Sequence, residues 1–148
     1  HRESGRRQME YRKDGDKLII RLDYGEEIME TLTTLLTDLG VGSASISGVG
    51  AVEDTTLGYF ETSTMTYEKT LFPEDMELVS FSGNVTLLNG KPFVHAHATI
   101  SGGDFRTLSG HVFSSTIAVT GEFHLTLFPT EVYREKDERT GLNLTRFA

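Results

Sequence analysis

Three histidines in the second half of the chain, His95, His97 and His111, are the residues best suited to do chemistry. Side chains alternate between the two faces of a β-strand, so His95 and His97 should project from one face, with roughly 6–7 Å between their Cα atoms. A third imidazole from a neighbouring strand would complete a three-nitrogen site for tetrahedral Zn²⁺ and leave the fourth position for water. His111 fits that role because a turn near residues 102–103 would bring its strand beside the pair.

The His-x-His pattern also has a purely structural interpretation, because a half-buried strand can carry two hydrogen-bonded histidines without any metal. The neighbouring residues make the face that carries the histidines distinctive. Thr99 lies on that same face and is a further residue of the possible pocket. The opposite face of this strand is apolar and consists of Val94, Ala96, Ala98 and Ile100.

Two more titratable residues, Glu122 and His124, share one face of the following predicted strand. Either could orient a metal ligand through a hydrogen bond to the ligating side chain. Glu122 is also the candidate for a catalytic acid or base. His124 has the alternative interpretation of a surface residue on that strand. A divalent ion held by the three histidines would activate water or polarise a carbonyl group.

Other catalytic patterns are absent from the sequence. There is no Gly-x-Ser-x-Gly, and Gly48-Val49-Gly50 does not continue to a third glycine at the dinucleotide-binding spacing. These glycines are better explained by a β-bulge or by a close approach of two backbones.

The side chains above need a sheet to hold them, and the sequence predicts one with a single helix. Apolar residues at helical spacing, from Ile28 to Leu39, follow the acidic residues Glu26 and Glu27, and Gly40 is placed to end the helix. Asn89-Gly90 predicts a tight hairpin turn, because both positions of a type I′ turn need positive φ. Strands are predicted over residues 17–23, 43–49, 55–60, 65–71, 77–88, 92–101, 111–119 and 122–128. The fold class is α+β, with a mostly antiparallel sheet and one main helix.

Composition limits the function classes. The 148 residues carry a net charge of −8, which disfavours direct binding to DNA, a polyanion. We expect a single domain over residues 9–148, with residues 1–8 an expression remnant or a frayed arm. The chain contains no cysteine, so disulfides and thiolate sites are excluded, which fits a cytoplasmic protein. No apolar run approaches the ~20 residues that a membrane span requires.

Five blocks of the sequence follow one another along the chain, namely residues 46–52, 57–59, 77–84, 90–97 and 109–111. In this order they resemble the PPC domain, also called DUF296, over roughly residues 11–144. The resemblance implies an α+β fold in which a bent antiparallel sheet packs with a helix, and assembly as a homotrimer. It also implies that His95, His97 and His111 are the family's histidines. The segment that begins at Arg134 resembles the family's C-terminal block, which implies an arginine in a pocket between subunits.

The resemblance leaves two main functions open. One is an oligomeric interaction module of a DNA-associated or transcription-regulatory kind, which acts through protein partners. The other is a zinc-dependent enzyme or a small-ligand-binding protein that uses the three histidines. Plant relatives contact DNA through an AT-hook with an Arg-Gly-Arg-Pro-type core, and this sequence has none, since Arg6-Arg7 lacks the glycine and the proline. Direct nucleic-acid binding therefore ranks last.

Overall fold

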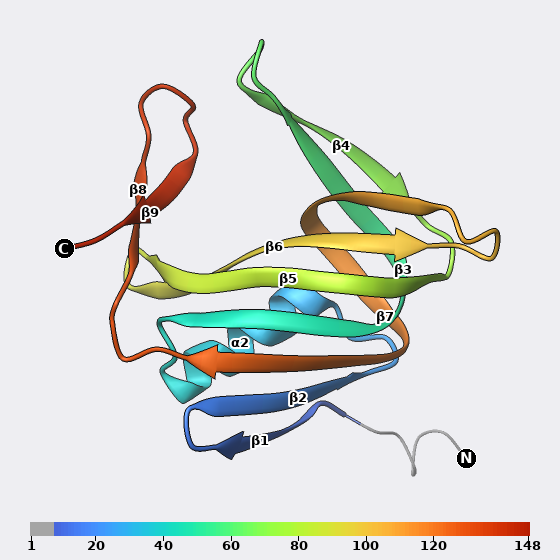
Figure 1. Ribbon diagram of the computed structural model, residues 1–148, viewed down its shortest axis with the longest axis horizontal. Helices are drawn as coiled ribbons and strands as arrows, with labels where there is room; N and C mark the ends of the chain where they lie inside the picture. Colours follow the sequence, from blue (N-terminus) through green and yellow to red (C-terminus); the bar gives the residue numbers. More distant parts are fainter. Residues whose placement is uncertain (1–7) are drawn as a thin grey trace.

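The computed structural model describes residues 8–148, and β-structure dominates it (Figure 1). Residues 1–8 were expected to be an expression remnant or a frayed arm, and all of them except Gln8 lie outside the described residues. Within the described part of the chain, no helix is long and apolar enough to cross a membrane.

Nine strands form one sheet, and a single helix in the described residues packs against it. Every strand pair is antiparallel except β5 with β8, which pair in parallel at one position. The elements in chain order are β1 (Glu10–Asp14), β2 (Lys17–Asp23), α2 (Ile28–Leu39), β3 (Ala44–Glu61), β4 (Thr66–Phe72), β5 (Met76–Leu88), β6 (Lys91–Ser101), β7 (Thr107–Leu127), β8 (Tyr133–Lys136) and β9 (Asn143–Arg146). The α+β class fits this arrangement, with sheet as its larger part.

Two long, bent strands, β3 and β7, organise the sheet. Each was expected as two strands, over residues 43–49 and 55–60 and over residues 111–119 and 122–128, and each is continuous instead. The first half of β7 pairs with β6 and with the end of β3, while its second half pairs with β2 and with the beginning of β3. Because β5 joins β3 to β6, these four strands pair in a closed cycle.

Irregular pairing explains why β3 continues where two strands were expected. The register against β5 shifts between Gly48 and Gly50, so these glycines do serve a bulge, as the sequence predicted. At Gly50 a Cβ atom would lie 2.0 Å from the carbonyl oxygen of Thr120 on β7. Only glycine permits this approach of the two backbones. The strand bends there without breaking.

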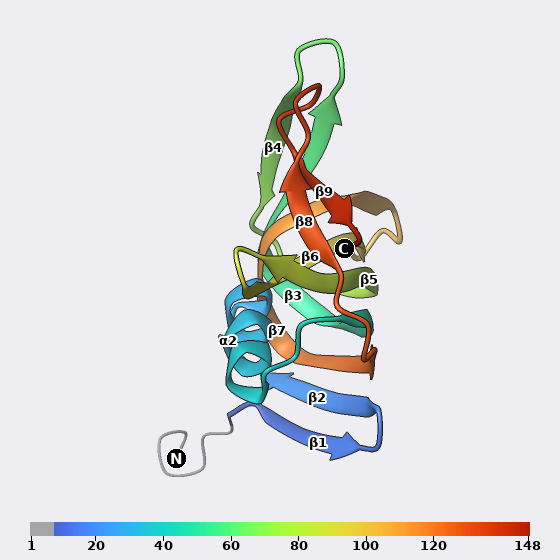
Figure 2. The same ribbon diagram turned by 90° about the vertical axis from the view of Figure 1, so that its left-hand side faces the viewer.

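Helix α2 confirms the sequence prediction at both ends. The carboxylate of Glu27 caps it by accepting from the backbone N–H groups of Met29 and Glu30, and it also accepts from the N–H of Ser115 on β7. Gly40 ends the helix with φ of 69°, in the left-handed region. The helix lies on one face of the sheet (Figure 2), where its apolar side forms the core with residues such as Phe81 and Phe123.

Two hairpins extend from the same end of the molecule (Figures 1 and 2). One joins the end of β3 to β4, and the other, not predicted from the sequence, is β8–β9. The predicted turn at Asn89-Gly90, which joins β5 to β6, is confirmed, with φ of 52° and 79°. The strand β1 was also not predicted, and all five of its residues are exposed.

Candidate metal centre

The three predicted histidines come together on one side of the sheet. His95 and His97 lie on β6 and His111 on β7, and one ligand atom from each lies within 4.8 Å of the others. The ring centroids are 5.2 Å apart for His95 and His97, 5.5 Å for His95 and His111, and 5.6 Å for His97 and His111. His97 is exposed, and the other two are partly buried.

Strand register accounts for this convergence. His97 on β6 is directly opposite His111 on β7, and His95 is two residues from His97, on the same face. On the other side of β6, strand β5 approaches closely at Gly83, where a Cβ atom would lie 2.0 Å from the carbonyl oxygen of His95. The histidines are therefore held on a backbone that neighbouring strands fix from both sides.

An aromatic wall supports His111. The ring of Phe113 lies 4.7 Å from the His111 ring, and the hydroxyl of Tyr67, on β4, lies 3.4 Å from His111 Nδ1. The wall depends on Gly58 of β3, where a Cβ atom would lie 2.3 Å from the ring of Phe113. Lys69 is also on β4, and its ammonium group lies 4.0 Å from the centre of the Phe113 ring.

Arg134 of β8 reaches the cluster from the β8–β9 hairpin, whereas Tyr67 and Lys69 belong to the hairpin of β3 and β4. Its Nη2 donates to Asn84 Oδ1 at 2.9 Å and lies 3.4 Å from His95 Nδ1. Its Nε donates to Thr86 Oγ1 at 2.7 Å, and its Nη1 donates to the carbonyl oxygen of Asn143 at 3.0 Å. All these acceptors are neutral, and no ion pair found among the described residues involves Arg134.

Burial controls the charge of the cluster. It is the main cause that lowers the pKa of His111 to about 4, and the nearby charges of His95, His97 and Lys69 lower it further. Burial likewise lowers the pKa of His95, with contributions from Arg134 and His97. Both imidazoles are therefore neutral at pH 7 and keep a lone pair for a metal ion.

The donor set fits a divalent metal ion. Around Zn²⁺, with bonds of about 2.1 Å, tetrahedral nitrogens lie about 3.4 Å apart, so modest ring rotations would close the present arrangement. Three imidazoles suit zinc, and the exposed His97 leaves one side of the site open to an incoming ligand. The hydroxyl oxygen of Tyr67 is placed to accept a hydrogen bond from His111 Nδ1–H, as a supporting partner of a ligand histidine commonly does.

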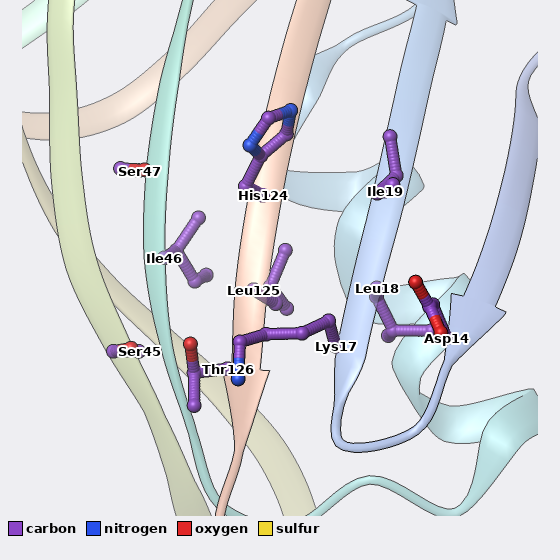
Figure 3. Close-up of a pocket in the computed structure, with 10 residues that line it drawn as sticks. All are labelled: Asp14, Lys17, Leu18, Ile19, Ser45, Ile46, Ser47, His124, Leu125 and Thr126. Carbon is purple, nitrogen blue, oxygen red and sulfur yellow. The ribbon is translucent and has the colours of Figure 1, made fainter.

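The structure does not bring Glu122 or His124 to the cluster. Both lie on the second half of β7, where Glu122 is opposite Val49, near the beginning of β3, whereas His111 is opposite Gly58, near its end. His124 lines a separate pocket of about 450 Å³ on the exposed face of the sheet, between Ser47 of β3 and Ile19 of β2 (Figure 3).

Thr99, by contrast, lies close to the histidines along β6. Its hydroxyl is 2.8 Å from that of Ser109, and both residues line a shallow hollow of about 340 Å³ together with His97. Sequence reasoning missed Tyr67, Asn84 and Thr86. No motif marks these residues, although Asn84 is in the strand that the Asn89-Gly90 turn pairs with the His-x-His strand.

The comparisons with known proteins agree with this geometry. The family model of the Plants and Prokaryotes Conserved (PCC) domain matches residues 9–129. A candidate DNA-binding protein from Bacteroides thetaiotaomicron is similar in structure, with a TM-score of 0.91, 30% identity, and coverage of 95% of this chain and 99% of the other. A metal-containing protein from Archaeoglobus fulgidus has a TM-score of 0.81 and 34% identity, with coverage of 93% and 97%.

A third solved structure, a plant- and prokaryote-conserved protein from Pyrococcus horikoshii, has a TM-score of 0.83 and 26% identity, with coverage of 95% of this chain and 96% of the other. The comparison with curated proteins found no match. The residues that the family model matches include all three histidines and end before Arg134.

Proposed function

The chain belongs to the Plants and Prokaryotes Conserved (PCC) domain family, and from that premise we propose that it binds one divalent metal ion, Zn²⁺, through His95, His97 and His111. The observation that carries the proposal is the convergence of three ligand nitrogens within 4.8 Å. The metal-containing relative from Archaeoglobus fulgidus supports it. The fourth metal position would then hold a small ligand, or water in an enzyme.

The chain's own residues would prepare this site in three ways. The aromatic wall of Tyr67 and Phe113 fixes the orientation of His111 and excludes water from one side. Burial keeps the imidazoles of His95 and His111 neutral, so no proton competes for their lone pairs at pH 7. The bound ion would act as a Lewis acid toward whatever occupies its open position.

Metal content tests the proposal directly. Protein purified without a metal-affinity step is expected to hold close to one zinc per chain by elemental analysis, and a His95→Ala/His97→Ala variant is expected to hold almost none. His124→Ala is the matched control, since it removes an exposed histidine of the same sheet that lies outside the cluster. A wild type that takes up no zinc from excess zinc, or a double variant that retains it, would refute the site.

A second candidate function is that of an oligomeric interaction module, and a hollow over the neighbouring strands β7, β3 and β5 favours it. Four exposed apolar residues gather there, beside the exposed carboxylates of Asp75 and Glu77. We propose a second copy of this chain as the occupant, in a homotrimer. Direct DNA binding ranks below both functions because of the net charge of −8. The exposed residues are Val49, Val79, Phe105 and Val119.

The mass of the protein in solution tests this second proposal. Light scattering is expected to give three times the chain mass, and Phe105→Asp/Val119→Asp is expected to reduce it to that of one chain, since two carboxylates cannot be buried unpaired at an interface. Phe147→Asp, at an exposed apolar residue away from the hollow, should leave the mass unchanged. A monomeric wild type at high concentration would contradict the trimer.

A further inference from the structure

Positive charge surrounds the histidine cluster although the protein as a whole is acidic. Arg134 approaches His95 from one hairpin, and Lys69 approaches the wall behind His111 from the other. Among the described residues, no carboxylate forms an ion pair with either cation, and the groups that could hold a metal here are three imidazoles with no carboxylate among them. The positive charges of Arg134 and Lys69 are therefore not neutralised by an ion pair within residues 8–148.

Arg134 is positioned by its contacts with neutral groups. Thr86, which is buried, accepts from Nε, and the side-chain oxygen of Asn84 accepts from Nη2. These contacts fix the plane of the guanidinium beside His95. Burial lowers the pKa of Arg134, and an arginine side chain remains charged in proteins. A fixed, partly buried guanidinium with no anionic partner is a ready donor for an oxyanion.

Metal binding would free one of those donors. Arginine can only donate, so its contact with His95 requires Nδ1 of that ring to accept. A metal bound at Nδ1 would use that lone pair, and a metal bound at Nε2 would leave Nδ1 carrying the ring proton. In either case Nδ1 can no longer accept from Arg134, and the guanidinium N–H that faces the cluster loses its partner.

We propose that Arg134 and the metal ion together bind an oxyanion group, a carboxylate or a phosphate, and that the natural ligand of this site is an anionic small molecule. The inference rests on the proposed metal site and names the chemical class of its ligand. One oxygen of the anion occupies the open metal position, and another accepts from Arg134. Lys69, farther away and exposed, raises the local concentration of anions without contacting the bound one.

Cobalt-substituted protein provides the test, because the visible spectrum of protein-bound Co²⁺ reports on its open position. Inorganic phosphate and acetate are titrated separately into Co²⁺-loaded protein in a chloride buffer. We expect saturable spectral changes, and the anion with the lower Kd identifies the oxyanion class. Arg134→Gln is expected to weaken binding about tenfold to a hundredfold, because it removes a charge-assisted hydrogen bond. Cobalt stoichiometry should be unchanged.

Two controls make the result specific. Arg146→Gln removes an arginine of the same hairpin, one that pairs with Glu135, and should leave the affinity for both anions unchanged. Metal-free wild type should bind phosphate more weakly than Co²⁺-loaded protein, and phosphate should increase the affinity for cobalt by the same factor. Hydrogen exchange shows whether the hairpin of Arg134→Gln is folded, because an unfolded hairpin would lose the protection of its β8–β9 amides. Arg134→Lys, which retains the charge, should preserve part of the affinity for the anion.

The outcomes separate the two proposals. If Co²⁺-loaded protein binds both anions equally well with and without Arg134, or binds neither, the oxyanion inference is wrong and the metal site stands. If the wild type takes up no cobalt or zinc, the proposed function itself fails. Saturable binding that depends on both the metal and Arg134 supports the inference.

Discussion

Removal of the metal is expected to lower the Tm by roughly 8–16 °C when the comparison is made at free zinc a thousandfold above its Kd. A ligand that binds only the folded state stabilises it by about 4 kcal/mol at that concentration. For a domain of this size, each kcal/mol moves the Tm by about 2–4 °C. The three ligands come from two strands that pair directly, so unfolding of either strand dismantles the site.

Thermal unfolding with EDTA and with added zinc measures this shift, and His97→Ala provides the clearest variant. His97 is exposed, so its loss should change the stability of the metal-free protein little while it abolishes the response to zinc. His124→Ala, which alters a similarly exposed histidine, should keep the full response. If EDTA leaves the Tm of zinc-loaded wild type unchanged, the histidines do not hold a metal that stabilises the folded state.

Gly83→Ala is expected to destabilise the protein by about 3 kcal/mol or more and to abolish metal binding. A Cβ atom at this position would lie 2.0 Å from the carbonyl oxygen of His95 and 2.8 Å from the Cα atom of Ala96. Both obstacles are backbone atoms, so no side-chain rotation relieves the clash, and β5 must separate from β6. The separation would displace His95 from the other ligands.

Urea denaturation and zinc analysis measure the two effects. Gly103→Ala is the matched control, because a Cβ atom there meets nothing within 4 Å and its φ is not in the left-handed region. It should unfold at the urea concentration of the wild type and retain its zinc. Wild-type stability in Gly83→Ala would mean that β5 and β6 are farther apart than the structure has them.

The sequence was sufficient to predict the three histidines because their positions follow from two local rules. Alternation along a strand puts His95 and His97 on one face, and a short turn returns the chain so that His111 lies opposite His97. Alternation also puts Glu122 and His124 on one face of their strand. It does not tell how far that face is from His111, because the distance depends on the bend of β7 and on its change of partners from β6 to β2.

The supporting residues depend on contacts between segments distant in sequence, and this is why they were not predicted. Tyr67 contacts His111 only because β4 pairs with the end of β3, which in turn pairs with β7. Arg134 was expected in a pocket on family resemblance, whereas its contact with His95 depends on a hairpin of two four-residue strands. Such short, exposed strands carry no apolar alternation from which they could be predicted.

The pairing of β2 with β7 has a consequence for the order in which a nascent chain can fold. The apolar residues Leu18 and Ile20 of β2 pair across the strands with Leu125 and Phe123 of β7 in the same core, and these partners leave the ribosome about a hundred residues later. Until then, β2 lacks the strand that joins it to the rest of the sheet. The domain therefore completes its core only after β7 has been synthesised, and its early segments are candidates for chaperone binding.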